Sequence, residues 1–389
     1  MKWNSIRTKV LAALAVCLVM GACGTLILLR YSFGRNAQAL ATESVTGAQK
    51  LFAILEARET SKMLAVGEAL MVNPEIRDAF AAKDRKRLLE VTGPLYAKLT
   101  KEHITNFFFQ TPEPDMKVFL RLTNPSKFGD ALNRFMDKEV VRTHAVVTGN
   151  ALAHSGFAVR VERPFYDSRG ALTGYIEFGE EIGQFIQEMK NQTGEDYGLL
   201  LSKKYMDRQY WADSMAVWRR RDNWDDNPNY VVAEKTTASD SIIQYQGDLS
   251  AMPKDGKVLD RFNNGDSVFV RGIFPIYDSA NNTVGAMFVV RDISGVYTSM
   301  RRTQSLIVLL SAAVQLCLTV MLLTLLNSLV FKRLMHIIAV VTRVVGGDYE
   351  SEIRAGSNDE IGQCEQLFEQ FRCVFVDVLA HVPEFQEKK

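Results

Sequence analysis

Two long uncharged apolar runs, one near each end of the chain, constrain the fold most strongly. Val10–Leu29 holds about 20 residues and Ser305–Phe331 about 27, and each is long enough to cross roughly 30 Å of hydrocarbon as a helix. We therefore expect transmembrane helices at 10–30 and 305–331, with a segment of about 270 residues between them.

The charges around these runs predict their orientation. Basic residues lie outside the pair of runs, at Lys2, Arg7, Lys9, Lys332, Arg333 and Arg343. The positive-inside rule then places both ends of the chain, including residues 1–9, in the cytoplasm and residues 31–304 on the outer face. A smaller basic group on the inner sides of the runs weakens this asymmetry, at Arg30, Arg35, Arg301 and Arg302.

The first run has two alternative interpretations. It could be a signal peptide cleaved near Ala37-Gln38-Ala39, or a lipoprotein signal that ends at Cys23. The apolar core of a signal peptide usually spans about 7–15 residues, whereas this run continues past Cys23 to Leu29. An uncleaved membrane anchor fits better.

Charge and cysteine usage exclude several classes of function. The chain carries 46 Lys plus Arg and 45 Asp plus Glu, a balance that argues against a nucleic-acid partner. None of the five cysteines lies between Tyr31 and Gln304, so we expect no disulfide and no cysteine-based metal or haem site there. The acidic stretch at 223–229 lacks the Gly and closing Glu of a calcium loop. We expect no metal, no cofactor and no catalytic residues.

The middle segment begins with a helical region and then becomes rich in β-formers. Residues 37–70 lack Pro and favour a long helix, which Asn73-Pro74 should end. Asp84 is placed to cap a further helix that runs to Leu99. Four short strands are expected after His103, at Ile104–Phe109, Lys117–Thr123, Phe157–Arg163 and Leu172–Phe178.

An internal repeat is the most informative pattern in this segment. Residues 157–182 return 111 positions later as residues 268–293, with eight identities over 26 positions. Each copy contains a strand that we expect to end at Pro164 or Pro275, a polar turn, and a second strand. The repeat predicts two similar α+β modules in tandem. We place the distal module at about 100–190 and the proximal one at about 195–293. The predicted elements between the two hairpins are a linking helix over 181–192, a strand over 197–201 and an amphipathic helix over 205–218.

The tail after the second run predicts two short helices with apolar seams. The first seam is Leu334, Ile338, Val341 and Val345, and the second is Ile361, Cys364, Phe368, Phe371, Phe375 and Val378. Their steps of three and four residues are typical of coiled coils. Glycines at 346 and 347 should end the first helix. Because neither helix can bury its seam alone, we expect a homodimer with a four-helix bundle.

Two tandem modules carried on a long helix between two membrane spans resemble the double Cache (tandem PAS-like) sensor domain of bacterial chemoreceptors and sensor histidine kinases. The resemblance covers about 40–295 and is carried by the phrases Phe119–Asp130, Gly174–Ile182 and Arg221–Asp226. It implies a periplasmic sensor domain at 31–304 in a two-pass protein of the bacterial inner membrane. It also implies a ligand pocket in the distal module.

The tail at 332–382 resembles a HAMP linker, with residues 383–389 beyond it. The positions that carry this likeness are Gly347, Asp348, Asp359, Glu360, Ile361 and Gly362, which we take as the signal-coupling residues. The usual proline early in the first HAMP helix is missing, and Leu334-Met335 stands in that region. The geometry with which the chain enters the bundle is therefore expected to differ.

For the pocket, we expect a small-molecule ligand held by Phe107, Phe109, Phe119, Arg121, Asp130, Tyr175 and Glu177. Strand alternation puts Phe119 and Arg121 on one face, where Arg121 offers a bidentate fork to a carboxylate. Phe107 and Phe109 would form an apolar wall. The alternatives are an ion pair of Arg121 with Asp130 or Glu177, phenylalanines that are plain core, and a turn-capping role for Asp130. Arg160 and Arg271 share a repeat position, which favours a scaffold role.

Together these patterns predict a non-enzymatic receptor, of chemotaxis or two-component type, that senses an organic acid, amino acid or amine. Arg121 favours an anion among these. About ten residues follow the last predicted helix, so we expect output through a separate cytoplasmic protein, a kinase or a receptor. The first alternative is an accessory membrane subunit without ligand. The second is a kinase remnant that is phosphorylated on His381.

Overall fold

The computed structural model describes residues 6–112, 116–153, 156–354 and 356–381. The chain divides into two compact units, one of residues 34–298 and one that combines residues 1–33 with 299–389. Residues 1–5 of the predicted cytoplasmic N-terminus and the predicted tail at 383–389 lie outside the described part of the chain.

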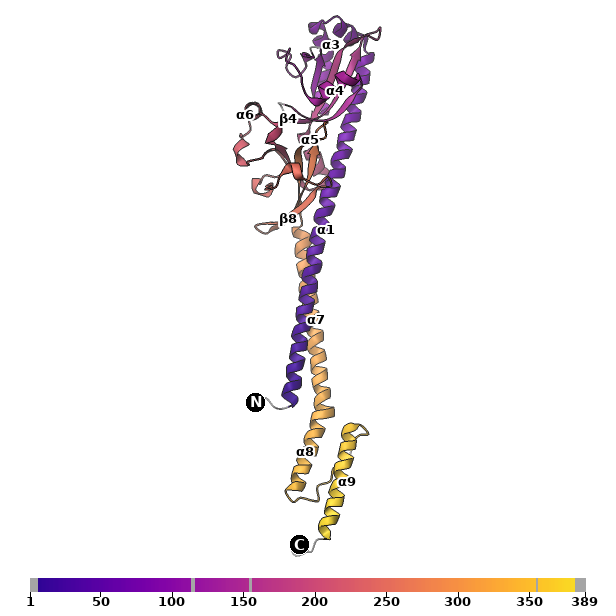
Figure 1. Cartoon of the computed structure of the whole chain (residues 1–389), viewed down its shortest axis with the longest axis vertical. Helices are drawn as coiled ribbons and strands as arrows, with labels where there is room; N and C mark the ends of the chain where they lie inside the picture. The colour runs from indigo at the N-terminus through magenta and orange to yellow at the C-terminus, as the bar shows by residue number, and fades with distance from the viewer. Residues whose placement is uncertain (1–5, 113–115, 154–155, 355, 382–389) are drawn as a thin grey trace. The chain divides into compact units, whose positions relative to one another are not determined.

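The unit of residues 34–298 contains two five-stranded antiparallel sheets and is α+β, as predicted (Figure 1). The distal sheet has the order β2-β1-β5-β4-β3 and the proximal sheet β7-β6-β10-β9-β8. The distal strands are β1 Ile104–Gln110, β2 Val118–Arg121, β3 Val147–Ala153, β4 Gly156–Tyr166 and β5 Leu172–Glu181. The proximal strands are β6 Asp196–Ser202, β7 Tyr230–Lys235, β8 Lys257–Asn264, β9 Ser267–Tyr277 and β10 Thr283–Asp292.

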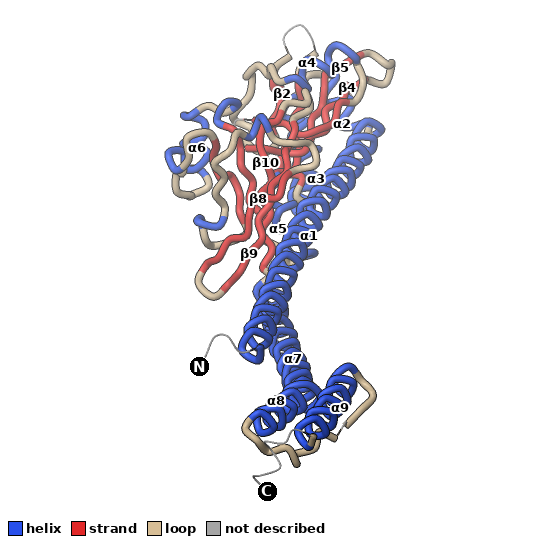
Figure 2. Tube along the Cα trace, turned by 60° about the horizontal axis from the view of Figure 1, so that its bottom comes forward, coloured by secondary structure: helices blue, strands red, loops and turns tan. Residues whose placement is uncertain are grey.

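One long helix supports both sheets. The helix α1 runs over Ile6–Val72, and its part within residues 34–298 lies along the sheets (Figure 2). Its buried apolar side chains share a single core with both modules, and Phe52 lies 6.0 Å from Phe185 and 6.2 Å from Phe274 between ring centroids. The other helices of this unit are α2 Pro74–Ala81, α3 Arg85–Leu99, α4 Phe135–Thr143, α5 Ile182–Thr193 and α6 Arg208–Val217.

The predicted helix start at Asp84 is confirmed by its cap, and Asn73 caps α2 in the same way. Asn73 accepts a hydrogen bond from the backbone of Ile76 at 3.2 Å, and Asp84 accepts one from Arg87 at 2.9 Å. These side chains satisfy backbone N–H groups that have no partner inside the first turn. They fix where α2 and α3 begin.

The two repeated hairpins have the same register, residue for residue. Arg160 pairs with Gly179 in the first, and Arg271 pairs with Val290 in the second. Every such pair is repeated 111 positions later, including the bulge next to the turn. The predicted pair of equivalent hairpins is confirmed.

The prolines do not end the strands, which corrects our expectation. Strand β4 continues through Pro164 to Tyr166, and β9 continues through Pro275 to Tyr277. The outer neighbour of each strand pairs only as far as residue 162 or 273. A proline beyond that point removes no hydrogen bond on that side, so the sheet tolerates it.

The unit that combines residues 1–33 with 299–389 contains the predicted apolar runs within two long helices. The most apolar part of α1 has a mean hydropathy of 2.5. That of the helix that starts with α7, Ser294–Leu326, is 2.6. Both are long and apolar enough to cross a membrane. α7 continues through a π-helical turn at Asn327–Phe331 into α8, Lys332–Val345, and α9 covers Glu360–Ala380.

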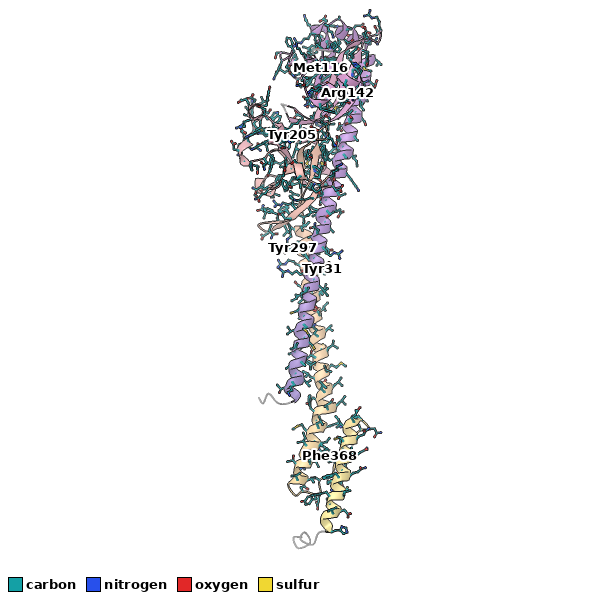
Figure 3. The ribbon with its side chains drawn as sticks, in the orientation of Figure 1. Tyr31, Met116, Arg142, Tyr205, Tyr297 and Phe368 are labelled. Carbon is teal, nitrogen blue, oxygen red and sulfur yellow. The ribbon has the colours of Figure 1, made fainter. Side chains whose placement is uncertain are left out.

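Helices α8 and α9 are joined by Arg333. Its guanidinium lies 2.7 Å from a carboxylate oxygen of Asp359 and 2.7 Å from one of Glu365. The residues that α8 buries are Ile337 and Val340, whereas Ile338 and Val345 of the predicted seam are 56% and 83% exposed. The seam of α9 is also open, since Phe371 is 66% exposed and Phe368, labelled in Figure 3, is 38% exposed.

Candidate ligand-binding site

The distal sheet has two faces of different chemistry. The face toward α1, α2 and α3 is apolar and holds Phe107, Phe109 and Phe178. The opposite face carries a buried polar cluster, which we define as Gln110, Arg134, Asp137, Arg160, Glu162 and Glu177. Alternation along β1, β4 and β5 separates the two sets.

Arg134 and Glu177 connect the centre of this cluster. Arg134 is the N-cap of α4, and its backbone N–H donates to Asp137 at 2.6 Å. Its guanidinium lies 2.9 Å from Glu177 Oε1 and also bonds Glu177 Oε2. Arg160 bonds Glu177 Oε1 at 2.5 Å, and Gln110 Nε2 donates to Oε2 at 3.1 Å. The Glu177 carboxylate is thus fully bonded.

The electrostatics follow from these contacts. Burial by itself would raise the pKa of Glu177, but Arg134 and Arg160 outweigh burial and lower it to about 2. Burial raises the pKa of Glu162 well above its usual range, and the neighbouring Glu177 and Asp137 carboxylates add to that rise. Two buried carboxyl groups on adjacent strands therefore titrate in opposite directions.

The proximal module shows that this cluster is not required by the fold. Its sheet places Phe288 at the position equivalent to Glu177, Ile273 at that of Glu162, and Leu200 at that of Gln110. These side chains belong to an apolar core. Arg271, the equivalent of Arg160, instead pairs with Asp260 at 2.6 Å. The two arginines therefore differ in role, and Arg160 belongs to the distal cluster.

A cavity of about 780 Å³ lies next to the cluster, at the junction of the two modules. We call it the junction cavity. Its distal side includes Asn106, Phe108, Arg121, Asp130, Arg134 and Arg160, and its proximal side Tyr205, Tyr210 and Trp211. Tyr205 lies between the modules, on the side of the sheets away from α1 (Figure 3).

The proximal side of the cavity comes from an insertion. Strands β6 and β7 are separated by residues 203–229, which contain α6, whereas the equivalent β1 and β2 are separated only by 111–117. Asp207 caps α6 by accepting hydrogen bonds from Gln209 at 2.8 Å and Tyr210 at 3.1 Å. The insertion thereby places three aromatic side chains against the distal module.

Of the seven predicted ligand-binding residues, the structure places Arg121 and Asp130 at the junction cavity. They form an ion pair at 2.8 Å, which was the predicted alternative for Arg121. Glu177 lies in the buried cluster, where Arg134 and Arg160 connect it to the cavity wall.

The other four predicted residues do not line the junction cavity. Phe107 and Phe109 are fully buried in the helix-facing core, because their strand positions point away from the polar face. Phe119 packs 5.7 Å from Phe80 between ring centroids. Tyr175 is fully buried, and its hydroxyl lies 3.3 Å from His144 Nδ1.

Most of the cluster was not predicted, and of the insertion only its helix was, over 205–218. Arg160 and Glu162 alternate with Val159 and Val161 in a buried strand, and that pattern could have marked a polar face. Nothing in the sequence indicates that α6 reaches the distal module.

A second cavity, of about 640 Å³, lies in the proximal module beside β7. Its charged side chains largely neutralise one another, as Arg220 pairs with Glu234 at 2.7 Å and Arg221 with Asp226. We therefore take the junction cavity as the candidate site.

Comparison with known proteins finds a family model that matches part of the chain. Residues 48–216 match the dCache_3 family, described as "Double sensory domain of two-component sensor kinase". None of the curated proteins matches. Among solved structures, the sensory domain of the Campylobacter jejuni chemoreceptor Tlp3 with isoleucine bound is 10% identical, with a TM-score of 0.40, and the match covers 68% of this chain and 96% of that one. The periplasmic domain of Vibrio cholerae LuxQ is 11% identical, with a TM-score of 0.36, and the coverage is 66% and 99%.

Proposed function

We propose that this chain, in which residues 48–216 form a double Cache sensor domain of the dCache_3 family, is a two-pass receptor of the bacterial inner membrane. Its sensor domain, 31–304, lies in the periplasm and binds a small molecule in the junction cavity. The spans at 10–30 and 305–331 carry the signal to a HAMP linker at 332–382, which acts on a cytoplasmic output protein. The chain is a sensor and not an enzyme.

One observation supports ligand binding above the others. Arg160 and Trp211 both line the junction cavity, and Arg160 Nε and Trp211 Nε1 are buried donors with no hydrogen-bond partner among the described residues. An unpaired buried donor costs about 1–3 kcal/mol. A ligand that brings an acceptor to these donors recovers part of that cost, and it would bridge the distal and proximal modules.

The membrane arrangement rests on the two apolar helices and on the charges beside them. The basic residues outside the runs favour a cytoplasmic position for both ends of the chain. The apolar surfaces of the two spans would then contact membrane lipid. A ligand that draws α6 toward the distal module would change the balance between two packings of the helices that enter the membrane. It can do so only through a different affinity for the two states.

The coupling role of the tail rests on its connector. Gly347 has a φ of +99°, which suits the end of α8. Asp359 accepts a hydrogen bond from the Gly362 backbone at 2.8 Å and so orders the start of α9, whose first residues are Glu360 and Ile361. Asp348 bonds the Ser351 hydroxyl at 2.7 Å. Open apolar seams on both helices favour pairing with a second copy as a homodimer.

A second candidate function is an accessory membrane subunit that regulates a partner protein without a ligand. It is favoured by Arg134, which satisfies Glu177 and Asp137 from within the chain. A ligand is then not needed to neutralise the cluster.

A ligand screen separates the two. We expect compounds from a library of organic acids, amino acids and amines to raise the melting temperature of the full chain in detergent. A ligand at 100 times its dissociation constant adds about 2.7 kcal/mol. Arg121→Ala should remove most of the shift, because it deletes a cavity side chain. Arg142→Ala changes an exposed arginine of the same module, at 69% side-chain exposure, and should keep it.

Two results would count against the receptor. The first is a library in which no compound shifts the melting temperature. The second is a shift that Arg121→Ala and Trp211→Phe both leave intact, since the ligand would then lie outside the junction cavity.

A further inference from the structure

One carboxyl group of the buried polar cluster has no partner. Asp137 and Glu177 are held by arginines, but neither oxygen of Glu162 has a hydrogen-bond partner among the described residues. Glu162 is 0% exposed, and so is Gln110. The amide oxygen Oε1 of Gln110 is likewise a buried acceptor without a donor.

The charges that face Glu162 do not neutralise it. Gln110 on β1 is neutral, β5 presents Glu177, and α4 with its N-cap presents Asp137 and Arg134. Its own strand contributes Arg160, and its partner on β3 is the apolar Val147. Three carboxyl groups thus share two guanidinium groups. An isolated buried carboxylate is so unfavourable that such a group usually takes up a proton.

A metal ion could in principle supply the missing charge. One oxygen each of Asp137, Glu162 and Glu177 lie within 4.8 Å of one another. However, the Asp137 and Glu177 oxygens already accept hydrogen bonds from Arg134 and Arg160. A divalent cation would have to displace these groups and would lie beside two positive charges, whereas a proton requires neither.

We propose that Glu162 is a proton-binding site of the distal module: it is held as a neutral carboxylic acid that donates its hydrogen bond to Gln110 Oε1. This bond satisfies both groups and leaves the cluster with no net charge. When the proton leaves to bulk water, a lone carboxylate remains beneath Arg134 and Arg160, which also line the junction cavity. The proposal rests on the cluster alone and does not depend on ligand binding.

The direction of the pH effect follows from linkage. A carboxyl group whose pKa is higher in the folded than in the unfolded chain contributes full stability below its unfolded pKa. That contribution is lost as the pH rises through the folded pKa. The distal module should therefore loosen in alkaline medium, with Glu162 as the group responsible.

The test compares the full chain in detergent with three variants. Glu162→Gln keeps the shape and removes the proton site, Glu162→Ile takes the side chain found at the equivalent position 273, and Glu90→Gln neutralises a half-exposed carboxyl of the same module. The melting temperatures of the wild type and of Glu90→Gln should fall as the pH rises from 6 to 9. Those of both Glu162 variants should fall distinctly less over the same range.

An infrared readout tests the same proton directly. Glu180 is a second buried carboxyl group, with a pKa raised to about 7 by burial, so this comparison is made in a Glu180→Gln background. At neutral pH the chain that keeps Glu162, with or without Glu90→Gln, should show the carbonyl band of a buried protonated carboxylic acid, and both Glu162 variants should lack it. If a Glu162 variant fails to fold, the Glu180→Gln chain alone decides the matter, because its band must disappear at alkaline pH.

Two outcomes overturn the proposal. One is the absence of the carbonyl band from the Glu180→Gln chain, or melting curves that run parallel in wild type and Glu162→Gln. The other is a melting temperature that calcium raises and a chelator lowers in wild type but not in Glu162→Gln. That result would make the cluster a cation site.

Discussion

At the scale of single residues, the chain places several carboxyl groups where water cannot reach them. Besides Glu162, the clearest is Glu180 at the end of β5. It faces Glu59 and Lys62 of α1, and Lys62 Nζ lies 3.3 Å from Glu180 Oε2. Burial first, and then Glu59, raises the pKa of Glu180 to about 7.

This pKa predicts a second pH effect, at the contact between α1 and the distal sheet. Because the folded pKa is raised, the stabilisation by Glu180 is complete below about pH 4 and is lost as the pH rises through about 7. At pH 8, Glu180→Gln should be more stable than wild type by about 1–3 kcal/mol. At pH 5 this advantage in the free energy of unfolding should be smaller. Denaturant unfolding at the two pH values measures the difference.

The control is Glu102→Gln, an exposed position of the same module. It should change the free energy of unfolding equally at both pH values. A constant difference between Glu180→Gln and wild type from pH 5 to 8 would contradict the prediction.

At the scale of elements, the repeated glycine of each hairpin marks a close approach between strands. A Cβ atom at Gly174 would lie 2.1 Å from the Gln110 carbonyl oxygen, and one at Gly285 would lie 2.4 Å from that of Leu200. We expect Gly174→Ala and Gly285→Ala each to cost about 1–3 kcal/mol, because the neighbouring strand must move.

Gly93→Ala is the matched control for these glycine variants. Gly93 lies within α3, and a Cβ atom there meets nothing within 4 Å. The change should stabilise the chain by up to about 1 kcal/mol, since alanine is the better helix former. Thermal unfolding of all three variants tests the contrast, which fails if Gly174→Ala or Gly285→Ala is neutral.

The open seam of α8 gives another prediction at this scale. In a background without native cysteines, Ile338→Cys should form a disulfide between two copies of the chain in membranes. Val340→Cys should not, because Val340 is only 1% exposed within one copy. Non-reducing electrophoresis after mild oxidation measures both, and equal cross-linking of the two would argue against a dimer through this seam.

At the scale of the whole molecule, the sequence predicted the fold better than the site. Hydrophobic patterns and the repeat predicted the long helix, both hairpins and the two-module order. They are local signals or compare the chain with itself. Strands β3, β7 and β8 were not predicted, and all three lie at sheet edges, where patterns are weak.

The candidate site was harder because its parts are far apart along the chain. Arg121 and Asp130 are nine residues apart and were predicted together. Trp211 meets the same cavity from 90 residues farther along, and no short-range pattern reports such a meeting. Phe107 and Phe109 lie on the helix-facing side of the sheet, away from this cavity. Alternation predicts which residues share a face but does not predict which face the helices cover.

The insertion at 203–229 has a consequence for chimeric receptors. A graft of the distal module alone onto a foreign membrane-proximal half would leave behind Tyr205, Tyr210 and Trp211, and with them one wall of the compartment. Because β6 pairs with β10, the smallest transplantable part extends from α1 through β10, and a graft joined at 190 should keep the distal sheet without this wall of the cavity.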